Sequence, residues 1–311
     1  MLSVIILNYE TLEYTLKCLR SVFKHPPACD FEVLVVDNGS QDGLAEAIRR
    51  EAPSAVFLPM RSNVGFGHAN NVAARRAKGD TLLFLNGDTR VLQGSLDGMI
   101  ERMGACPDVA ILGPKQLDSW GRLQLASGIF PSFRRVLFDE LTAFRALRSP
   151  GALLDDAPEK KRGFEAADWI SSSCFMIRRR VFLELGGWDE NFFLYFEDID
   201  LCRRARDAGW HVHASFDMRT SMIHHGGVSA VKNMLRTELE YRRSQLRFIK
   251  KYYDRRGLWK LRLFLFVKAA GQMAPNGLIF LSAKMLGRES KISRGRLLLA
   301  KKTIELAWGK C

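Results

Sequence analysis

The stretch FEVLVVDNGS, residues 31–40, has the pattern of a buried strand that ends in a turn. The same pattern recurs at 2–9, 55–60 and 80–88, where LSVIILNY, AVFLPM and DTLLFLNGD are apolar runs closed by polar or turn residues. Helical periodicity fills the intervals at 11–25, 44–52 and 67–79, the last closed by Gly79. Strands that alternate with helices predict an α/β fold with a doubly wound, mostly parallel sheet.

Polar residues gather where three of the predicted strands end, at Asn8, at 37–40 and at 86–88. Ligands of such sheets bind outside the C-terminal ends of the strands. We therefore expect a ligand site at this edge.

The rest of the N-terminal two thirds is less regular. Residues 145–163, RALRSPGALLDDAPEKKRG, predict a mobile loop because they are polar and contain Pro and Gly. The segment 168–198 predicts a strand, a short helix and a turn, and 210–229 predicts a strand followed by a His-Gly loop.

The C-terminal part is basic and helical from about residue 231. The stretch 231–257 predicts a long basic helix, and the apolar stretches 258–274 and 277–287 carry lysines and arginines. A membrane-spanning helix is disfavoured because no uncharged run reaches 18 residues. Amphipathic helices on an anionic membrane surface fit this composition. Helices that pack on the N-terminal domain or on another subunit are the alternative.

The composition narrows the class of partner and the compartment. A net charge of +13 favours a polyanion: nucleic acid, an anionic membrane or a phosphorylated substrate. The six cysteines form no CxxC pair, so reduced thiols in a cytosolic protein are expected rather than disulfides or a zinc site. The N-terminal MLSVIILNYE has neither a basic region nor a cleavage site, so no signal peptide is predicted.

Three carboxylates crowd the stretch FLYFEDIDLCRRARDAGW, residues 193–210. Asp200 fits a helix start, with Arg203 or Arg204 at pairing distance along the helix. Glu197 and Asp198 follow an aromatic run, where partial desolvation would raise the carboxyl pKa and favour a general base.

Six segments together resemble the family 2 glycosyltransferases with the GT-A fold, in particular the bacterial rhamnosyltransferase-like group. These segments are VIILNY (4–9), VVDNGSQDG (35–43), NVGFGHANN (63–71), LFLNGDTRV (83–91), GGWDENFFLYFEDIDLCRR (186–204) and HHGGVS (224–229). The resemblance covers about residues 1–230. It implies a nucleotide-sugar-dependent catalytic domain there. The basic, helical composition of 231–311 predicts a membrane-associated extension.

The resemblance implies a nucleotide-sugar site at the strand ends. Asp37 would accept a hydrogen bond from the imide N–H of uracil or thymine, although an Asx turn also explains it. The glycine-rich turn with Asn63, Gly65 and Gly67 would admit the diphosphate to a helix N-terminus, although a plain connection is the alternative. The remaining expected nucleotide-sugar contacts are Asn8, Asn38, Asn86 and Asp88.

The resemblance also implies a divalent cation, Mg²⁺ or Mn²⁺, at Asp88 and His224. LNGDT takes the place of the family's DxD-type motif, with Asn86 where many members have the first Asp and Gly87 where Pro is common. His224 fits the H-x-x-G-x-S pattern, and His225 stays an alternative.

For the chemistry, the resemblance implies Asp198 as the base and Glu197 as the residue that positions the acceptor or Asp198. Trp188 and Asp189 would form a loop over the sugar and acceptor. Trp169 would stack on a sugar ring or belong to the core. Ser172 stands where relatives often have Gly, which changes the expected acceptor site.

The resulting hypothesis is an inverting, metal-dependent glycosyltransferase on the inner face of the plasma membrane, peripheral and cytoplasmic. Its donor would be dTDP-L-rhamnose or, alternatively, UDP-hexose, UDP-GlcNAc or UDP-galactofuranose. Its acceptor would be a lipid-linked or polysaccharide hydroxyl. Two alternatives are disfavoured. The sequence has no basic, Gly-rich signature of a nucleotidyltransferase near its N-terminus. A nucleic-acid-binding module would give the ordered carboxylates no role. We expect no nucleic-acid partner, and the oligomeric state stays open.

Overall fold

The computed structural model describes residues 1–137, 163–226, 234–285 and 291–309. The loop predicted at 145–163 lies outside the described residues except for Gly163, and so does the end of the HHGGVS segment. The described residues fall into two compact units. The first contains 1–130, 163–193 and 197–226, and the second contains 131–137, 194–196, 234–285 and 291–309.

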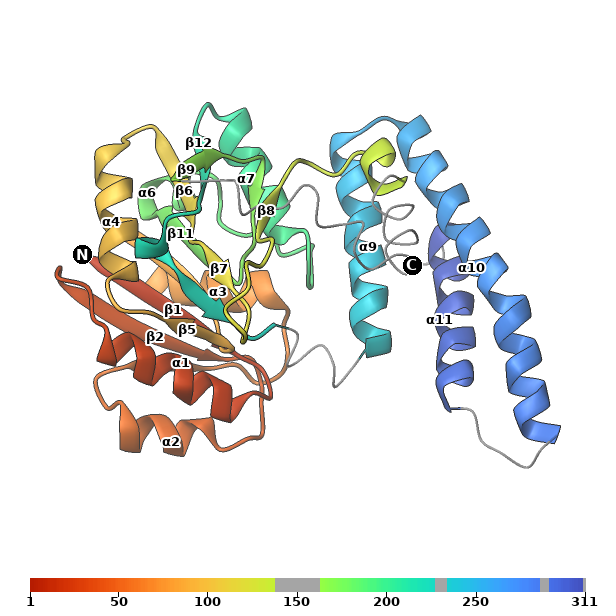
Figure 1. The fold of residues 1–311 in the computed structure, drawn as a ribbon, viewed down its shortest axis with the longest axis horizontal. Helices are drawn as coiled ribbons and strands as arrows, with labels where there is room; N and C mark the ends of the chain where they lie inside the picture. Colours follow the sequence, from red (N-terminus) through yellow and green to blue (C-terminus); the bar gives the residue numbers. More distant parts are fainter. Residues whose placement is uncertain (138–162, 227–233, 286–290, 310–311) are drawn as a thin grey trace. The chain divides into compact units, whose positions relative to one another are not determined.

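Eight strands of the described residues form one mixed sheet in the first unit (Figure 1), in the order β3-β2-β1-β4-β11-β6-β12-β9. Their bounds are β1 Leu2–Asn8, β2 Phe31–Asp37, β3 Val56–Pro59, β4 Thr81–Asn86, β6 Val109–Gly113, β9 Phe164–Ala166, β11 Cys174–Arg178 and β12 His211–Ser215. The pairs β1–β2, β2–β3, β1–β4 and β6–β12 are parallel, which confirms the predicted mostly parallel α/β sheet.

The register of the parallel strands explains why polar side chains meet at one edge. Asn8 pairs with Asp37 across β1 and β2, and Leu7 pairs with Asn86 across β1 and β4. Within β1, Val4 and Ile6 are fully buried, so the apolar run is fixed in the core. Because side chains alternate along a strand, burial of these residues fixes the register. The register in turn determines which residues lie at the C-terminal ends of the strands.

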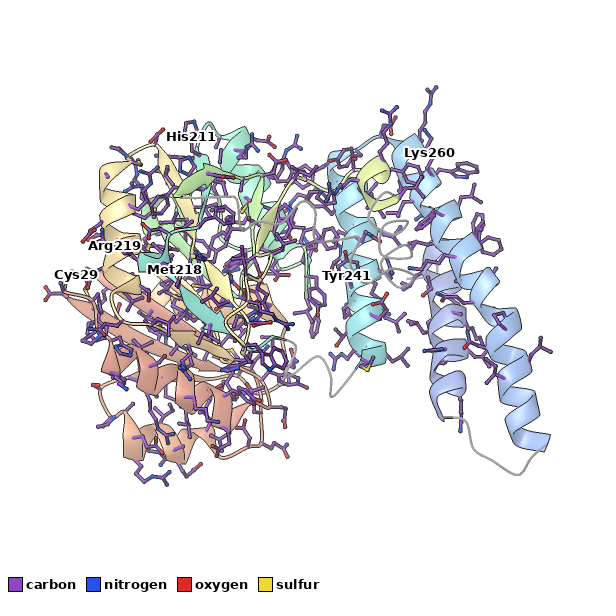
Figure 2. The ribbon with its side chains drawn as sticks, in the orientation of Figure 1. Cys29, His211, Met218, Arg219, Tyr241 and Lys260 are labelled. Atoms are coloured by element: carbon purple, nitrogen blue, oxygen red, sulfur yellow. The ribbon has the colours of Figure 1, made fainter. Side chains whose placement is uncertain are left out.

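Helices flank the sheet, and the first three lie in the intervals where the periodicity predicted helices. They are α1 Leu12–Lys24, α2 Leu44–Glu51, α3 Phe66–Arg76, α4 Ser95–Ala105, α6 Arg179–Glu184, α7 Glu197–Asp207 and the 3₁₀ turn η2 Met218–Thr220. Arg219 of η2, labelled in Figure 2, donates to Glu101 of α4 at 2.7 Å. The prediction that Gly79 closes α3 is wrong, since the helix ends at Arg76 and a Cβ on Gly79 would lie 2.6 Å from the Ser3 nitrogen.

Two small sheets complete the first unit. One joins β5 (Thr89–Val91), β13 (Met222–His224) and β7 (Gln116–Leu117), and it pairs His224 with Thr89. The other joins β8 (Ser127–Gly128) to β10 (Trp169–Ile170). The first of these brings the predicted histidine beside the Asp88 turn, from a distant part of the sequence.

The second unit contains three long helices, α9 (Met234–Tyr252), α10 (Arg255–Met285) and α11 (Lys291–Ala307). The two apolar stretches predicted at 258–274 and 277–287 form one helix, α10, which continues through Pro275. Buried apolar side chains hold these helices together, among them Phe248, Leu261 and Leu265. Within the described residues, none of the helices combines the length and the hydropathy that crossing a bilayer requires.

Candidate functional site

Asn8 is the centre of a buried polar network at the end of β1. Its amide nitrogen donates to Asp37 and Ser40 at 3.1 and 2.9 Å. Its amide oxygen accepts from the hydroxyls of Thr11 and Thr15 at 3.0 and 2.8 Å. Because Asn8 is 0% exposed and bonded at both ends, it orients Asp37. The direct nucleotide contact expected of Asn8 stays a prediction.

Asp37 is held by one of its two carboxylate oxygens. Oδ1 accepts from Asn8 and from the Ser40 backbone N–H at 3.2 Å. The bonds seen among the described residues all end on Oδ1, which leaves Oδ2 as an acceptor at the sheet edge. An acceptor-only group in this position suits a donor N–H of a nucleobase.

Asn38 and Asn63 shape the loop before α3. The Asn38 amide nitrogen donates to Asn63 Oδ1 at 3.1 Å, and its oxygen accepts from the Val64 N–H at 3.0 Å. Asn63 Oδ1 also accepts from the Gly65 N–H at 3.0 Å. The side chains of Asn38 and Asn63 thus hold the loop in shape. The part of this loop that a ligand would contact is its backbone.

Gly65 is required by this loop for two reasons. Its φ of 90° lies in a region that side chains rarely adopt. A Cβ there would also lie 2.8 Å from the carbonyl oxygen of Phe193, which accepts from the Phe66 N–H at 2.9 Å. The glycine loop is therefore packed directly against the segment that leads to Glu197.

Asp88 sits in a tight turn after β4. The preceding Asn86 donates its backbone N–H to the Ser173 carbonyl at 3.0 Å, and Thr89 donates its hydroxyl to the same oxygen at 3.0 Å. Gly87 in this turn has no room for a side chain, since a Cβ on it would lie 2.3 Å from the Thr15 hydroxyl. This turn places the nearly buried Asp88 carboxylate at the C-terminal end of the sheet.

His224 faces Asp88, with its Nε2 at 3.3 Å from Asp88 Oδ1. Its other ring nitrogen, Nδ1, lies 2.9 Å from Gln124 Oε1. A donor bond from Nδ1 to an amide oxygen leaves the Nε2 lone pair for a metal, which is the usual arrangement of metal-bound histidines. Gln124 was not anticipated from the sequence, because nothing local marks it.

His225 has different surroundings. Its Nδ1 lies 2.7 Å from the Ser119 hydroxyl, and its ring packs edge-on against Tyr14 at 5.4 Å. Burial lowers the pKa of His225. Of the two histidines, His224 is therefore the one whose ring nitrogen is aimed at Asp88.

Asp88 and His224 fit a divalent cation as a pair of protein ligands. The described residues contain no cluster of three or more His, Cys, Asp or Glu that could hold a metal. A carboxylate and an imidazole suit Mn²⁺ better than a carboxylate alone, and the diphosphate of a nucleotide sugar would supply further oxygen ligands.

The carboxylate pair at the start of α7 is held by Ser172. The Ser172 backbone N–H donates to Asp198 Oδ2 at 3.0 Å, and its hydroxyl donates to Glu197 Oε1 at 3.2 Å. Asp198 Oδ1 also accepts from the Ile199 N–H at 2.8 Å. The serine that departs from the relatives' glycine is therefore the residue that orients both acids.

The two acids differ in exposure. Glu197 is 2% exposed and its Oε2 has no hydrogen-bond partner among the described residues, whereas Asp198 is half-buried. Burial raises the pKa of both carboxyls, and the nearby Asp198 charge raises that of Glu197 further. Backbone N–H donors offset part of the effect at Asp198. Of the two carboxyls, Glu197 is therefore the one that retains a proton more readily.

Asp200 has the structural role predicted for it. It is fully buried and accepts from Arg204 Nε at 2.8 Å, four residues along α7. The same guanidinium donates to the carbonyl oxygens of Leu185 and Gly187 at 2.6 and 2.8 Å. Asp200 and Arg204 thus lock α7 to the loop that precedes Trp188.

The residues expected on the acceptor side lie in three different settings. Trp188 is 1% exposed and packs in an aromatic cluster with Phe66, Phe84 and Phe175, so its ring faces the core and not an acceptor. Trp188 therefore anchors its loop from the core side, and the predicted role of this loop over the sugar and acceptor stays a prediction. Trp169 is half-buried and donates its indole N–H to the Ile129 carbonyl at 3.0 Å.

Asp189 is half-buried in the loop that Trp188 anchors. Its Oδ1 accepts from the backbone and side-chain nitrogens of Asn191 at 3.0 and 2.8 Å. Asn71 of α3 fixes the same loop, bonding both the Trp188 backbone and Glu190. Asn71 was missed in the sequence because a buried amide leaves no periodic signal.

Known proteins resemble this chain in sequence. The chain matches the family Glycosyl transferase family 2 over residues 3–186. An N-acetylglucosaminyl-diphospho-decaprenol L-rhamnosyltransferase of Mycobacterium tuberculosis is 30% identical over 189 residues, which cover 57% of this chain and 62% of the relative. Rhamnosyltransferase WbbL of Escherichia coli is 26% identical over 159 residues, 48% of this chain and 57% of the relative. Each match spans less than two thirds of the relative's own length.

A solved structure shares the fold. The mannosyltransferase of Pyrobaculum calidifontis in complex with GDP-Man and Mn²⁺ superposes with a TM-score of 0.55 at 17% identity, covering 99% of this chain and 86% of that one. The family match spans more than half of the chain, in the region that builds the Asp37, Asp88 and Ser172 framework. The family resemblance seen in the sequence is thus confirmed: this chain belongs to glycosyl transferase family 2.

Proposed function

We propose that this protein is an inverting glycosyltransferase that moves a sugar from a nucleotide-diphosphate donor to an acceptor hydroxyl. One observation carries the proposal. Ser172 holds the Asp198 carboxylate, and the next residue, Ser173, holds the turn that contains Asp88. A single backbone turn therefore sets the position of an acid pair relative to a strand-end carboxylate, as transfer with a fixed attack direction requires.

Asp198 is the base of this proposal. Its raised pKa and partial exposure suit a carboxylate that takes a proton from an acceptor hydroxyl as that oxygen attacks the anomeric carbon. Burial favours the neutral form of Glu197, so this residue adds no second negative charge beside Asp198. The anomeric carbon–oxygen bond to the diphosphate breaks as the new bond forms on the opposite face.

Asp88 and His224 would hold Mg²⁺ or Mn²⁺. When bound, the cation would offset the negative charge that develops on the diphosphate leaving group. The Pyrobaculum enzyme contains Mn²⁺ with its nucleotide sugar, which supports a divalent ion in this fold.

For the donor, Asp37 Oδ2 is the proposed acceptor for the imide N–H of uracil or thymine. The rhamnosyltransferase relatives favour dTDP-L-rhamnose, with UDP-hexose, UDP-GlcNAc or UDP-galactofuranose as the alternatives. The Mycobacterium relative is named for a diphospho-decaprenol substrate, which supports a lipid-linked acceptor.

A lipid-linked acceptor calls for contact with an anionic membrane, and α10 offers a surface for it. Trp259, Leu263 and Val267 are spaced four residues apart and are 58, 37 and 59% exposed. Lys260, labelled in Figure 2, adds a cation on the same helix. Exposed aromatic and aliphatic side chains beside lysines are typical of helices that lie in a membrane interface. We propose a cytoplasmic protein that is peripheral on the inner face of the plasma membrane.

A donor screen tests the nucleotide site and the metal site together. We expect one nucleotide class among dTDP-, UDP- and GDP-sugars to raise the melting temperature only with Mn²⁺. Asp88→Ala should lose that shift, whereas the exposed control Asp30→Ala should keep it. An equal rise in melting temperature with and without Mn²⁺ would show that donor binding does not depend on the metal.

Asp198→Asn tests the base. We expect kcat to fall by about 10²–10⁴-fold, the usual contribution of a general base, with donor affinity within a few-fold of the wild type. Asp207→Asn, at the exposed end of the same helix, is the matched control. Near-normal turnover in Asp198→Asn would exclude Asp198 as the base.

A further inference from the structure

Basic side chains gather where α1 lies beside β5 (Figure 1). Lys17, Arg20 and Lys24 share one face of α1, because residues three, four and seven apart lie on the same side of a helix. Arg90 of β5 is the fourth cation. The hollow that they form has a volume of about 410 Å³ and is lined by Lys17, Arg20, Ser21, Lys24, His25, Arg90 and Leu92. We call it the α1–β5 hollow, and no acidic side chain of the described residues lines it.

The charge of the α1–β5 hollow is only partly balanced. Arg20 donates to Glu51 at 2.6 and 2.8 Å, and Glu51 also accepts from Arg50. In the described part of the chain, Lys24 and Arg90 are exposed and form no ion pair. Unbalanced like charges around one depression create a positive potential that a bound anion would relieve.

The neutral groups of the hollow are already committed to the fold. The Ser21 hydroxyl donates to the Cys18 carbonyl at 2.6 Å and accepts from the Val91 N–H at 2.9 Å. The aliphatic stems of the lysines and arginines make up most of the lining surface, so recognition depends on their N–H donors turning toward a bound anion. These donors suit a compact group with several negatively charged oxygens, and arginine in particular can bind phosphate with two parallel hydrogen bonds.

A purely structural explanation accounts for part of this cluster. Lys24 lies in the last turn of α1, where a cation interacts favourably with the helix dipole. The dipole does not explain Lys17, which lies in the second turn, or Arg90, which belongs to a strand. The convergence of two separate elements on one hollow is the observation from which we infer a ligand.

We propose that the α1–β5 hollow binds phosphate groups. The ligand is either the phosphate headgroup of an anionic lipid or a phosphate in solution, and both have the same chemistry. The proposal does not depend on the proposed glycosyl transfer.

His25 gives a local readout, because its half-buried imidazole lines the hollow. Its ring resonance in the full chain can be assigned by its loss in His25→Gln and then followed during titration with pyrophosphate, without added metal. We expect a saturable shift in the wild type. Lys24→Gln/Arg90→Gln should raise the half-saturation concentration roughly 25-fold, at about fivefold for each cation removed.

The matched control is Arg76→Gln/Lys78→Gln, which removes two exposed cations outside the hollow and should titrate like the wild type. Vesicles of phosphatidylglycerol, with phosphatidylcholine as the neutral comparison, separate the two sources of phosphate. Weaker vesicle binding by the hollow variant than by the control identifies a lipid headgroup. An effect on pyrophosphate alone identifies a soluble phosphate. Equal behaviour of both variants in both assays would overturn the proposal.

Discussion

Ser172 shows how one side chain can organise the chemistry of this site. Its backbone N–H bonds Asp198, and its hydroxyl bonds Glu197 and also acts on Asp198, so a side-chain change leaves only the backbone bond in place. In Ser172→Ala the Asp198 bond persists, while a buried oxygen of Glu197 loses its donor. We expect a loss of about 1 kcal/mol in the free energy of unfolding and a kcat about tenfold lower.

The matched control for that prediction is Ser171→Ala. Ser171 exchanges a hydrogen bond with Ser173 at 3.0 Å and, within the described residues, has no side-chain bond to either acid. If Ser172 positions the acids, its variant lowers kcat while the KM for the donor stays within a few-fold, and the control keeps both. A rise in donor KM alone would contradict the positioning role.

Glu197 predicts a pH-dependent stability. Burial raises its pKa in the folded state, so the folded protein holds a proton that the unfolded chain releases above its ordinary pKa of about 4.3. The contribution of Glu197 to the free energy of unfolding is therefore complete below a pH of about 4.3 and is lost as the pH rises toward the pKa of the folded state. Glu197→Gln should therefore raise the melting temperature at pH 8 and leave it unchanged at pH 4. Equal differences at both pH values would show that Glu197 does not titrate in this way.

At the scale of elements, the loop before α3 depends on a glycine that no other residue can replace. Gly65 combines a positive φ with a close approach, because a Cβ added to it would lie 2.8 Å from the Phe193 carbonyl oxygen. Gly43, before α2, has a similar φ of 81°, but a Cβ there would meet no atom of the described residues within 4 Å. We expect Gly65→Ala to lower the free energy of unfolding by about 3 kcal/mol and Gly43→Ala by about 1 kcal/mol. Chemical denaturation of both variants checks this, and equal losses would mean that the contact with Phe193 is unimportant.

The strands and helices of the first hundred residues were predictable because burial leaves a period in the sequence. The runs at 2–9, 31–40 and 80–88 became β1, β2 and β4, and the pairing of Asn8 with Asp37 followed from their parallel register. Periodicity does not show which polar side chains form hydrogen bonds with each other. The burial of Asn8 and the hydrogen bond of Gln124 to His224 were therefore found only in the structure. The buried position of the Trp188 ring was also not predictable, because an aromatic residue in a polar motif looks the same whether its ring faces a ligand or the core.

At the scale of the whole molecule, the net charge of +13 has no single origin. One part is the α1–β5 hollow in the first unit, and another is the basic residues of α9, α10 and α11 in the second. The charge alone predicted a polyanionic partner, but only the structure separates cations paired with acids, such as Arg204, from those that remain exposed. The exposed ones are the cations that a membrane or a phosphate can bind.

Membrane association by the exposed face of α10 is the prediction that concerns the whole protein. Deletion of 258–311 should abolish binding to anionic vesicles, but it also removes buried side chains such as Leu261, so a surface variant is the sharper test. Trp259→Ala removes a 58% exposed ring and should weaken vesicle binding about tenfold without changing the melting temperature. Trp120→Ala, which removes a 79% exposed ring from the first unit, is the control and should bind normally. Cosedimentation with phosphatidylglycerol vesicles measures both, and equal binding by the two variants would mean that α10 is not the membrane surface.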